Sequence, residues 1–154
     1  MPKNYSVEAD YYLYGIELGI LSFETAIDWA DRIIAIESEP EIEIIEVALS
    51  RPRGRNGVME ALASVKGTRQ SQVAGEMLLK DLNVQLQNGG SLKEISSKAL
   101  SVSWATQMPE DIRWAFDHVD DDIALAEQGI YVDIYQCKIE LQKLLDRYQY
   151  HGQT

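Results

Sequence analysis

Residues 22–34, with the sequence SFETAIDWADRII, decide the fold class of this chain. Ser22 is a preferred helix N-cap residue, and the apolar side chains after it recur three or four positions apart, which is the spacing of one face of an α-helix. The apolar residues are Phe23, Ala26, Ile27, Ala30, Ile33 and Ile34, and the carboxylates Glu24, Asp28 and Asp31 fall on the other side. This stretch therefore predicts an amphipathic helix with one buried and one charged face.

The same period continues on both sides of this stretch. We expect further helices, separated by prolines, glycines and capping residues, at residues 10–21, 38–49, 58–65, 68–86, 91–102, 109–128 and 134–148. Valine and threonine are not clustered as they are in strands. We therefore predict an all-α fold, a single compact domain of about six to eight helices over residues 1–154. Residues 149–154 are expected to form a frayed tail.

The helix at residues 38–49 has a competing interpretation. The sequence SEPE at residues 38–41 resembles a capping box with proline in the first turn, which predicts a helix to about Leu49. The sequence EIEI at residues 41–44 alternates with a period of two, which is typical of a strand. The helical spacing of Ile45, Ala48 and Leu49 favours the helix, and a strand over residues 41–49 stays the alternative.

The composition is that of an ordinary globular protein, with 45% hydrophobic and 25% charged residues among 154. The N-terminus lacks the apolar segment of a signal peptide, and no apolar run approaches the length of a membrane span. The single cysteine, Cys137, excludes an internal disulfide and a cysteine-based zinc site. We expect a cytoplasmic, bacterial-type protein that carries no cofactor and does not associate with membranes.

Charge is divided unevenly along the chain, whose net charge is −11. Residues 1–50 hold 11 acidic and 2 basic side chains, residues 51–107 hold 4 and 8, and residues 108–154 hold 10 and 4. A mostly acidic surface repels the phosphates of nucleic acid, so we expect no direct nucleic-acid binding. The charge instead favours a basic protein as the partner.

The basic middle segment begins with a predicted loop at residues 50–57, SRPRGRNG. Its guanidinium groups, on Arg51, Arg53 and Arg55, suit the recognition of carboxylate or phosphate groups. The alternative is that these arginines rest against the acidic helices of the same molecule. The loop is not a phosphate-binding P-loop, because no Gly-Lys-Ser/Thr sequence follows it.

The acidic run DHVDDD at residues 117–122 is a candidate metal site. On a helix His118 and Asp122 are one turn apart, as are Asp117 and Asp121, and these side chains could hold a divalent metal. The competing interpretation is a solvated helix face. A small helical metal-dependent enzyme that uses this cluster is therefore an alternative function, although no nucleophile elbow or other catalytic motif is present.

The N-terminal third contains the sequences YLYGIELGILS at 12–22, AIDWAD at 26–31 and EPEI at 39–42. Through these residues it resembles small helical bacterial proteins of the immunity type. Immunity proteins neutralise a partner toxin, often a basic nuclease, by occluding it. The matching residues are structural, so the resemblance assigns no functional residue.

We predict from these observations a non-enzymatic binding protein that captures a basic partner. The residues expected at the interface are Glu24, Asp28, Trp29, Asp31, Glu41 and Glu43, which combine carboxylates with one large aromatic side chain. A further alternative is a self-associating scaffold, a homodimer in which oppositely charged patches of two copies pair.

Overall fold

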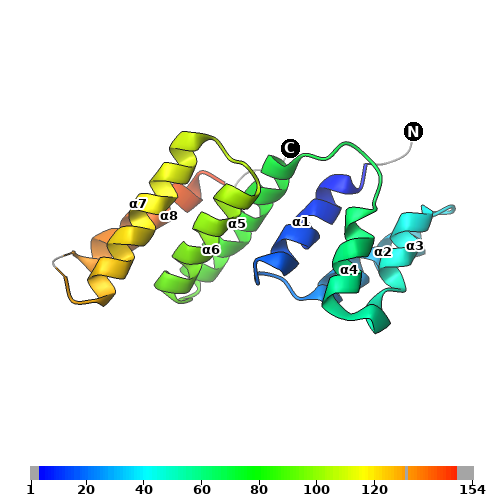
Figure 1. Ribbon diagram of the computed structural model, residues 1–154, viewed down its shortest axis with the longest axis horizontal. Helices are drawn as coiled ribbons and strands as arrows, with labels where there is room; N and C mark the ends of the chain where they lie inside the picture. The colour runs from blue at the N-terminus through cyan, green and yellow to red at the C-terminus, as the bar shows by residue number, and fades with distance from the viewer. Residues whose placement is uncertain (1–3, 131, 149–154) are drawn as a thin grey trace. The chain divides into compact units, whose positions relative to one another are not determined.

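The structure, a computed structural model, describes residues 4–130 and 132–148. Within these residues it contains eight α-helices, one short 3-10 helix and no β-strand (Figure 1). The elements are α1 (Ser6–Glu17), α2 (Phe23–Ile36), α3 (Ile42–Ala48), η1 (Arg51–Arg53), α4 (Gly54–Ala63), α5 (Ser71–Gln87), α6 (Leu92–Ala105), α7 (Glu110–Glu127) and α8 (Ile134–Asp146). The all-α prediction with six to eight helices is confirmed.

The chain divides into two compact units, Met1–Ala74 and Gly75–Thr154. Helices α1 to α4 belong to the first unit, and α6 to α8 belong to the second. Helix α5 begins in the first unit and continues in the second. The predicted frayed tail at residues 149–154 lies outside the described residues.

In the first unit, α2 packs on α3, and α4 packs on both α1 and α3. The stripe predicted for α2 is confirmed, since Ala26, Ile27, Ala30 and Ile33 are buried. They join a core to which α3 contributes Ile44 and Val47, and α4 contributes Val58 and Leu62. Helices α2 and α4 therefore pack against every other helix of this unit, and α1 and α3 each pack against these two.

In the second unit, α7 packs on both α6 and α8. The largest fully buried side chains of the second unit include Leu78, Leu82, Phe116, Ile123, Leu141 and Leu145. The Ser91 side chain caps the start of α6, because it accepts a hydrogen bond of 3.3 Å from the backbone N–H of Glu94. Asp133 caps α8 in a similar way, through the backbone N–H of Tyr135.

Residues 41–49 are helical, as favoured over the strand alternative. The helix begins later than the capping-box prediction, however, because Glu41 and not Ser38 is its N-cap residue. Glu41 accepts backbone hydrogen bonds from both Ile44 and Ile45 through its carbonyl oxygen.

The prediction of a loop over residues 50–57 is wrong. Residues Arg51–Arg53 form a 3-10 turn and α4 begins directly at Gly54. Proline is accepted in the first turn of a helix, so Pro52 supports the turn that it was expected to prevent. Gly54 has a φ of 70°, a left-handed conformation that glycine adopts without strain, and this joins the turn to the helix.

No helix in the described part of the chain is long and apolar enough to cross a membrane.

Candidate protein-interaction surface

Helix α2 presents carboxylates along its outer face. Glu24, Asp28 and Asp31 recur at helical spacing, and the structure places Asp28 and Asp31 in the exposed class and Glu24 in the half-buried class. Neither aspartate forms an ion pair with any residue in the described ranges. Their negative charge is therefore directed to solvent and is not neutralised inside the unit.

Trp29 is a core residue, and its prediction as a surface anchor is wrong. Its side chain is 4% exposed, and its ring packs against the rings of Tyr5 and Tyr12 at centroid distances of 6.3 and 5.3 Å. The indole N–H donates a hydrogen bond to a carboxylate oxygen of Glu8. Trp29 therefore fastens α2 to α1, because the apolar ring and its single donor are both satisfied inside the unit.

The two glutamates predicted on α3 are partly withdrawn from solvent. The Glu43 carboxylate lies 3.5 Å from Lys66 Nζ and its side chain is largely buried. Glu41 Oε2 is buried without a hydrogen-bond partner among the described residues. Both side chains contribute less to an outer acidic surface than Asp28 and Asp31 do.

Three exposed apolar side chains on or beside α3 were missed at the sequence level. Ile36, Ile42 and Leu49 are 72%, 68% and 71% exposed. Ile42 and Leu49 share one face of α3 with the exposed Glu46, since these positions are four and three residues apart. Burial of Ile44 and Val47 on one side of α3 leaves Ile42 and Leu49 on the other, and the sequence alone does not show which side is buried.

The basic residues of segment 51–55 are used within the first unit. Arg55 Nη2 donates to the carbonyl oxygens of Ile16 and Glu17, each at 3.3 Å, at the C-terminal end of α1. A cation at that end is favourable because the carbonyls there have no partner within the helix. Arg53 Nη1, in η1, lies 4.0 Å from Glu60 Oε2 of α4, and Arg51 is exposed. The alternative that the arginines rest against their own molecule is confirmed for Arg55, although its partners are backbone carbonyls and not carboxylates.

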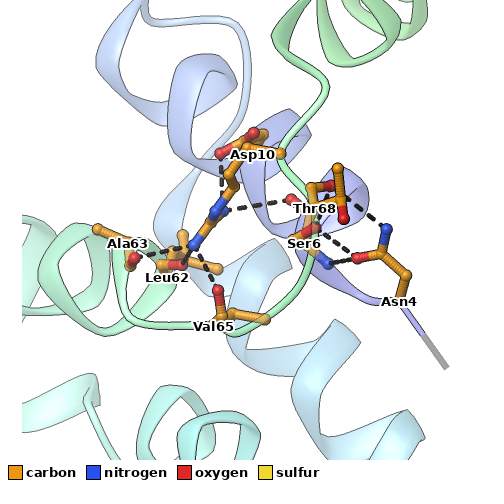
Figure 2. Close-up of polar contacts among 8 residues, drawn as sticks. Asn4, Ser6, Asp10, Leu62, Ala63, Val65 and Thr68 are labelled. Carbon is orange, nitrogen blue, oxygen red and sulfur yellow. Dashed lines mark hydrogen bonds and ion pairs between the residues drawn. The ribbon is translucent and has the colours of Figure 1, made fainter. Parts of the chain in front are cut away.

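Arg69 plays a similar role at the end of α4 (Figure 2). Its Nη1 donates to Asp10 Oδ1 at 2.7 Å and to the carbonyl oxygen of Ser6 at 3.2 Å. Its Nη2 donates to the carbonyl oxygens of Leu62, Ala63 and Val65, at 3.1, 2.8 and 2.6 Å. One guanidinium group thus joins α1 to the last turn of α4.

Burial raises the pKa of the Asp10 carboxyl above its usual value of 3.8, although the neighbouring Arg69 acts in the opposite direction. The loss of hydration is the larger effect, so the charged carboxylate is costly at this position. This pair is a structural element of the first unit and not a site open to ligands.

A second set of hydrogen bonds joins the start of α1 to the segment that follows α4. Thr68 accepts from Ser6 Oγ at 2.7 Å and from Asn4 Nδ2 at 3.3 Å through its carbonyl oxygen (Figure 2). This use of Thr68 explains why α5 begins at Ser71 and not at Thr68 as predicted. Gly67 has a φ of 136° and lies so close to Asn4 that a Cβ at this position would clash with Asn4 Oδ1.

The candidate metal ligands on α7 are not brought together as a set. His118 Nε2 lies 3.4 Å from Asp122 Oδ2, and the imidazole is largely exposed. Asp117 is half-buried and Asp121 is exposed. Across residues 4–130 and 132–148, no group of three or more His, Cys, Asp or Glu side chains is arranged to hold a metal ion.

Comparison with known proteins gives no match to this chain among family models, curated proteins or solved structures.

Proposed function

We propose that this chain is a non-enzymatic acidic binding protein that captures and occludes a basic partner protein. The interacting region is the α2–α3 surface, defined as Asp28 and Asp31 on α2, Ile36 at its end, and Ile42, Glu46 and Leu49 on or next to α3. These two helices pack against each other in the first unit. We place this function in the cytoplasm of a bacterial cell.

One observation carries the proposal. Two exposed carboxylates with no ion-pair partner in the described ranges occupy the outer face of a helix that is otherwise firmly held in the core. A rigid helix that presents unneutralised charge attracts an oppositely charged protein and speeds their encounter. The exposed Ile36 at the end of α2, with Ile42 and Leu49 on or next to α3, adds apolar area that association can bury.

The resemblance of residues 12–42 to immunity-type proteins is part of the same proposal. Those residues form the second half of α1, all of α2 and the first residue of α3, which build and support the α2–α3 surface. An immunity protein acts by covering its partner, which requires a stable surface and no catalytic group. We therefore propose occlusion of a basic toxin as the biological role.

The partner can be identified and the surface tested in one experiment. The wild-type chain, an Asp28→Lys/Asp31→Lys variant and an Asp121→Lys/Glu127→Lys variant are used as baits in cell extract. The last two change the net charge equally, but Asp121 and Glu127 are exposed residues of α7 in the second unit. We expect a basic protein to be retained by the wild type and by the α7 variant, and to be lost from the α2 variant.

Association rates measured with the purified partner at low salt give the decisive result. A rate for the Asp28→Lys/Asp31→Lys variant equal to that of the wild type would contradict the proposal. Equal losses in the α2 and α7 variants would show that only net charge matters, and would also contradict a surface on α2 and α3.

A further inference from the structure

The segment between α2 and the end of α3 combines exposed apolar side chains with negative charge alone. Residues 33–50 contain five glutamates and no lysine, arginine or histidine. Ile36, Ile42 and Leu49 are each about two-thirds or more exposed within this segment. Isolated exposed apolar residues are common on proteins, but three within fourteen positions on a helix pair form a candidate contact patch.

The spacing on α3 indicates the shape of the occupant. Ile42 and Leu49 are seven residues apart on one helix face, which separates them by about 10 Å along the axis. A partner helix with apolar residues at positions i, i+3, i+4 and i+7 presents anchors at the same spacing. Glu46 lies between the two apolar residues on that face, and Glu39 is exposed in the turn before α3. The margin of the patch is therefore acidic at Glu39 and Glu46, while the exposed Arg51 follows two residues after Leu49.

We infer that α3, with Ile36 of α2, is the docking face for an amphipathic helix of the partner whose polar margins are basic. This inference rests on the proposed function and specifies it, because it names the element by which the basic partner is held. The aspartates of α2 attract the partner, and the apolar residues of α3 hold it. Charge complementarity decides the choice, since lysine or arginine beside the partner's apolar face would meet Glu39 and Glu46.

A second copy of this chain is a poorer occupant. In a symmetric contact the same patch meets itself, so the acidic margin of one copy would face the acidic margin of the other. Like charges brought together in this way oppose association.

The test uses the full chain and a synthetic peptide. The peptide has about 18 residues, enough for five helical turns, and carries leucine at positions i, i+3, i+4 and i+7 with lysine at the other positions. A control peptide has the same composition in an order that gives no apolar face. Binding is followed by the fluorescence anisotropy of a label on the peptide.

Two double variants distinguish binding at the α3 patch from non-specific binding to exposed apolar residues elsewhere. Ile42→Ser/Leu49→Ser removes the apolar residues of α3, and Val84→Ser/Ile139→Ser removes two exposed apolar residues of the second unit. All four residues are exposed, so we expect both variants to keep the circular dichroism spectrum of the wild type. We expect the amphipathic peptide to bind the wild type about tenfold more tightly than the control peptide, and to lose about tenfold in affinity only with the α3 variant.

Several results would overturn the inference. These are equal binding of the two peptides, no measurable binding of either, or full affinity in the α3 variant. Self-association of the chain in sedimentation that the α3 substitutions abolish would assign the patch to a second copy instead. If the α3 variant binds normally while Asp28→Lys/Asp31→Lys weakens binding, the docking helix is wrong and the proposed acidic binding function stands.

Discussion

Arg69 connects more backbone of the first unit than any single apolar side chain can. Its five hydrogen bonds reach α1 through Ser6 and Asp10, and reach the end of α4 through the carbonyl oxygens of Leu62, Ala63 and Val65. Without the guanidinium group those carbonyls would lose this donor, and the Asp10 carboxylate would lose its cation. Removal of one member of such a pair costs more than the pair itself contributes.

We expect Arg69→Ala to lower the free energy of unfolding by about 3 kcal/mol, the lower end of the range for breaking a buried ion pair, because the arginine side chain is partly exposed. Urea denaturation followed by circular dichroism measures the change. Arg51→Ala, at an exposed position, is the control and should stay within about 0.5 kcal/mol of the wild type. Equal stability of Arg69→Ala and wild type would show that the hydrogen bonds do not support the unit.

The raised pKa of Asp10 predicts how the stability of the chain depends on pH. Because its pKa is higher in the folded chain than the usual 3.8, the unfolded chain ionises first as the pH rises. The contribution of this group to stability is therefore complete below about pH 4 and is lost as the pH rises through the folded pKa. The stability of the wild type relative to Asp10→Asn should therefore fall as the pH rises above about 4. Urea titrations at several pH values measure this difference, and a rise with pH would contradict it.

Tyr5 is a second titrating residue with a structural partner. Its hydroxyl donates a hydrogen bond to Glu37, the C-cap residue of α2, and this bond is the main reason that its pKa is raised from 10.0 to about 12. The stability that the bond provides is present below pH 10 and is lost as the pH rises towards 12. We expect Glu37→Gln to lower the pKa of Tyr5, as measured by carbon NMR of the tyrosine ring. An unchanged pKa in this variant would assign the shift to burial alone.

At the scale of elements, long helices were predictable and the orientation of short ones was not. The sequence predicts a helix at residues 68–86, and α5 runs from Ser71 to Gln87, with Ala74, Leu78, Leu82 and Leu86 buried at helical spacing. Helix α3 has seven residues and is apolar at most positions, so its sequence is compatible with more than one buried face. The packing of α2 and α4 selects Ile44 and Val47, which local sequence cannot show.

The start of α5 illustrates how a helix can depend on a residue without a side chain. A Cβ on Gly75 would lie 2.2 Å from Thr106 Oγ1 and 2.9 Å from Met108 Cε. The Thr106 hydroxyl is fixed by its own hydrogen bond to the carbonyl oxygen of Val102, so it cannot simply turn away. Close packing of α5 against the end of α6 therefore requires glycine.

We expect Gly75→Ala to destabilise the chain by about 1–3 kcal/mol, the usual cost of overpacking. Alanine is the better helix former by about 0.5–1 kcal/mol, and this gain is too small to offset the clash. Thermal and urea unfolding measure the result, with Gln87→Ala at an exposed position of the same helix as control. A variant more stable than the wild type would show that the helices separate at little cost.

At the scale of the whole molecule, the division of charge looks different once the units are known. The first unit has 12 acidic and 7 basic residues and the second has 13 and 7, so both are acidic. The basic middle segment predicted from sequence is split between them. Arg55 and Arg69 are engaged with helix ends in the first unit, which sequence could not reveal because most of these partners are backbone carbonyl oxygens that any residue type carries.

This charge distribution leads to a prediction about association with the basic partner. Exposed charges separated by more than about 8 Å are screened at physiological ionic strength. We therefore expect the association rate constant to fall as salt is added, while the dissociation rate constant changes little, because dissociation depends on the packed contacts. Stopped-flow or surface plasmon resonance measurements over a range of salt concentrations give both constants.

Asp28→Lys/Asp31→Lys should flatten the salt dependence of the association rate more than Asp121→Lys/Glu127→Lys, because local charge on the docking surface acts at a shorter distance than charge elsewhere. A salt-independent association rate in the wild type would show that acidic steering plays no part in recognition.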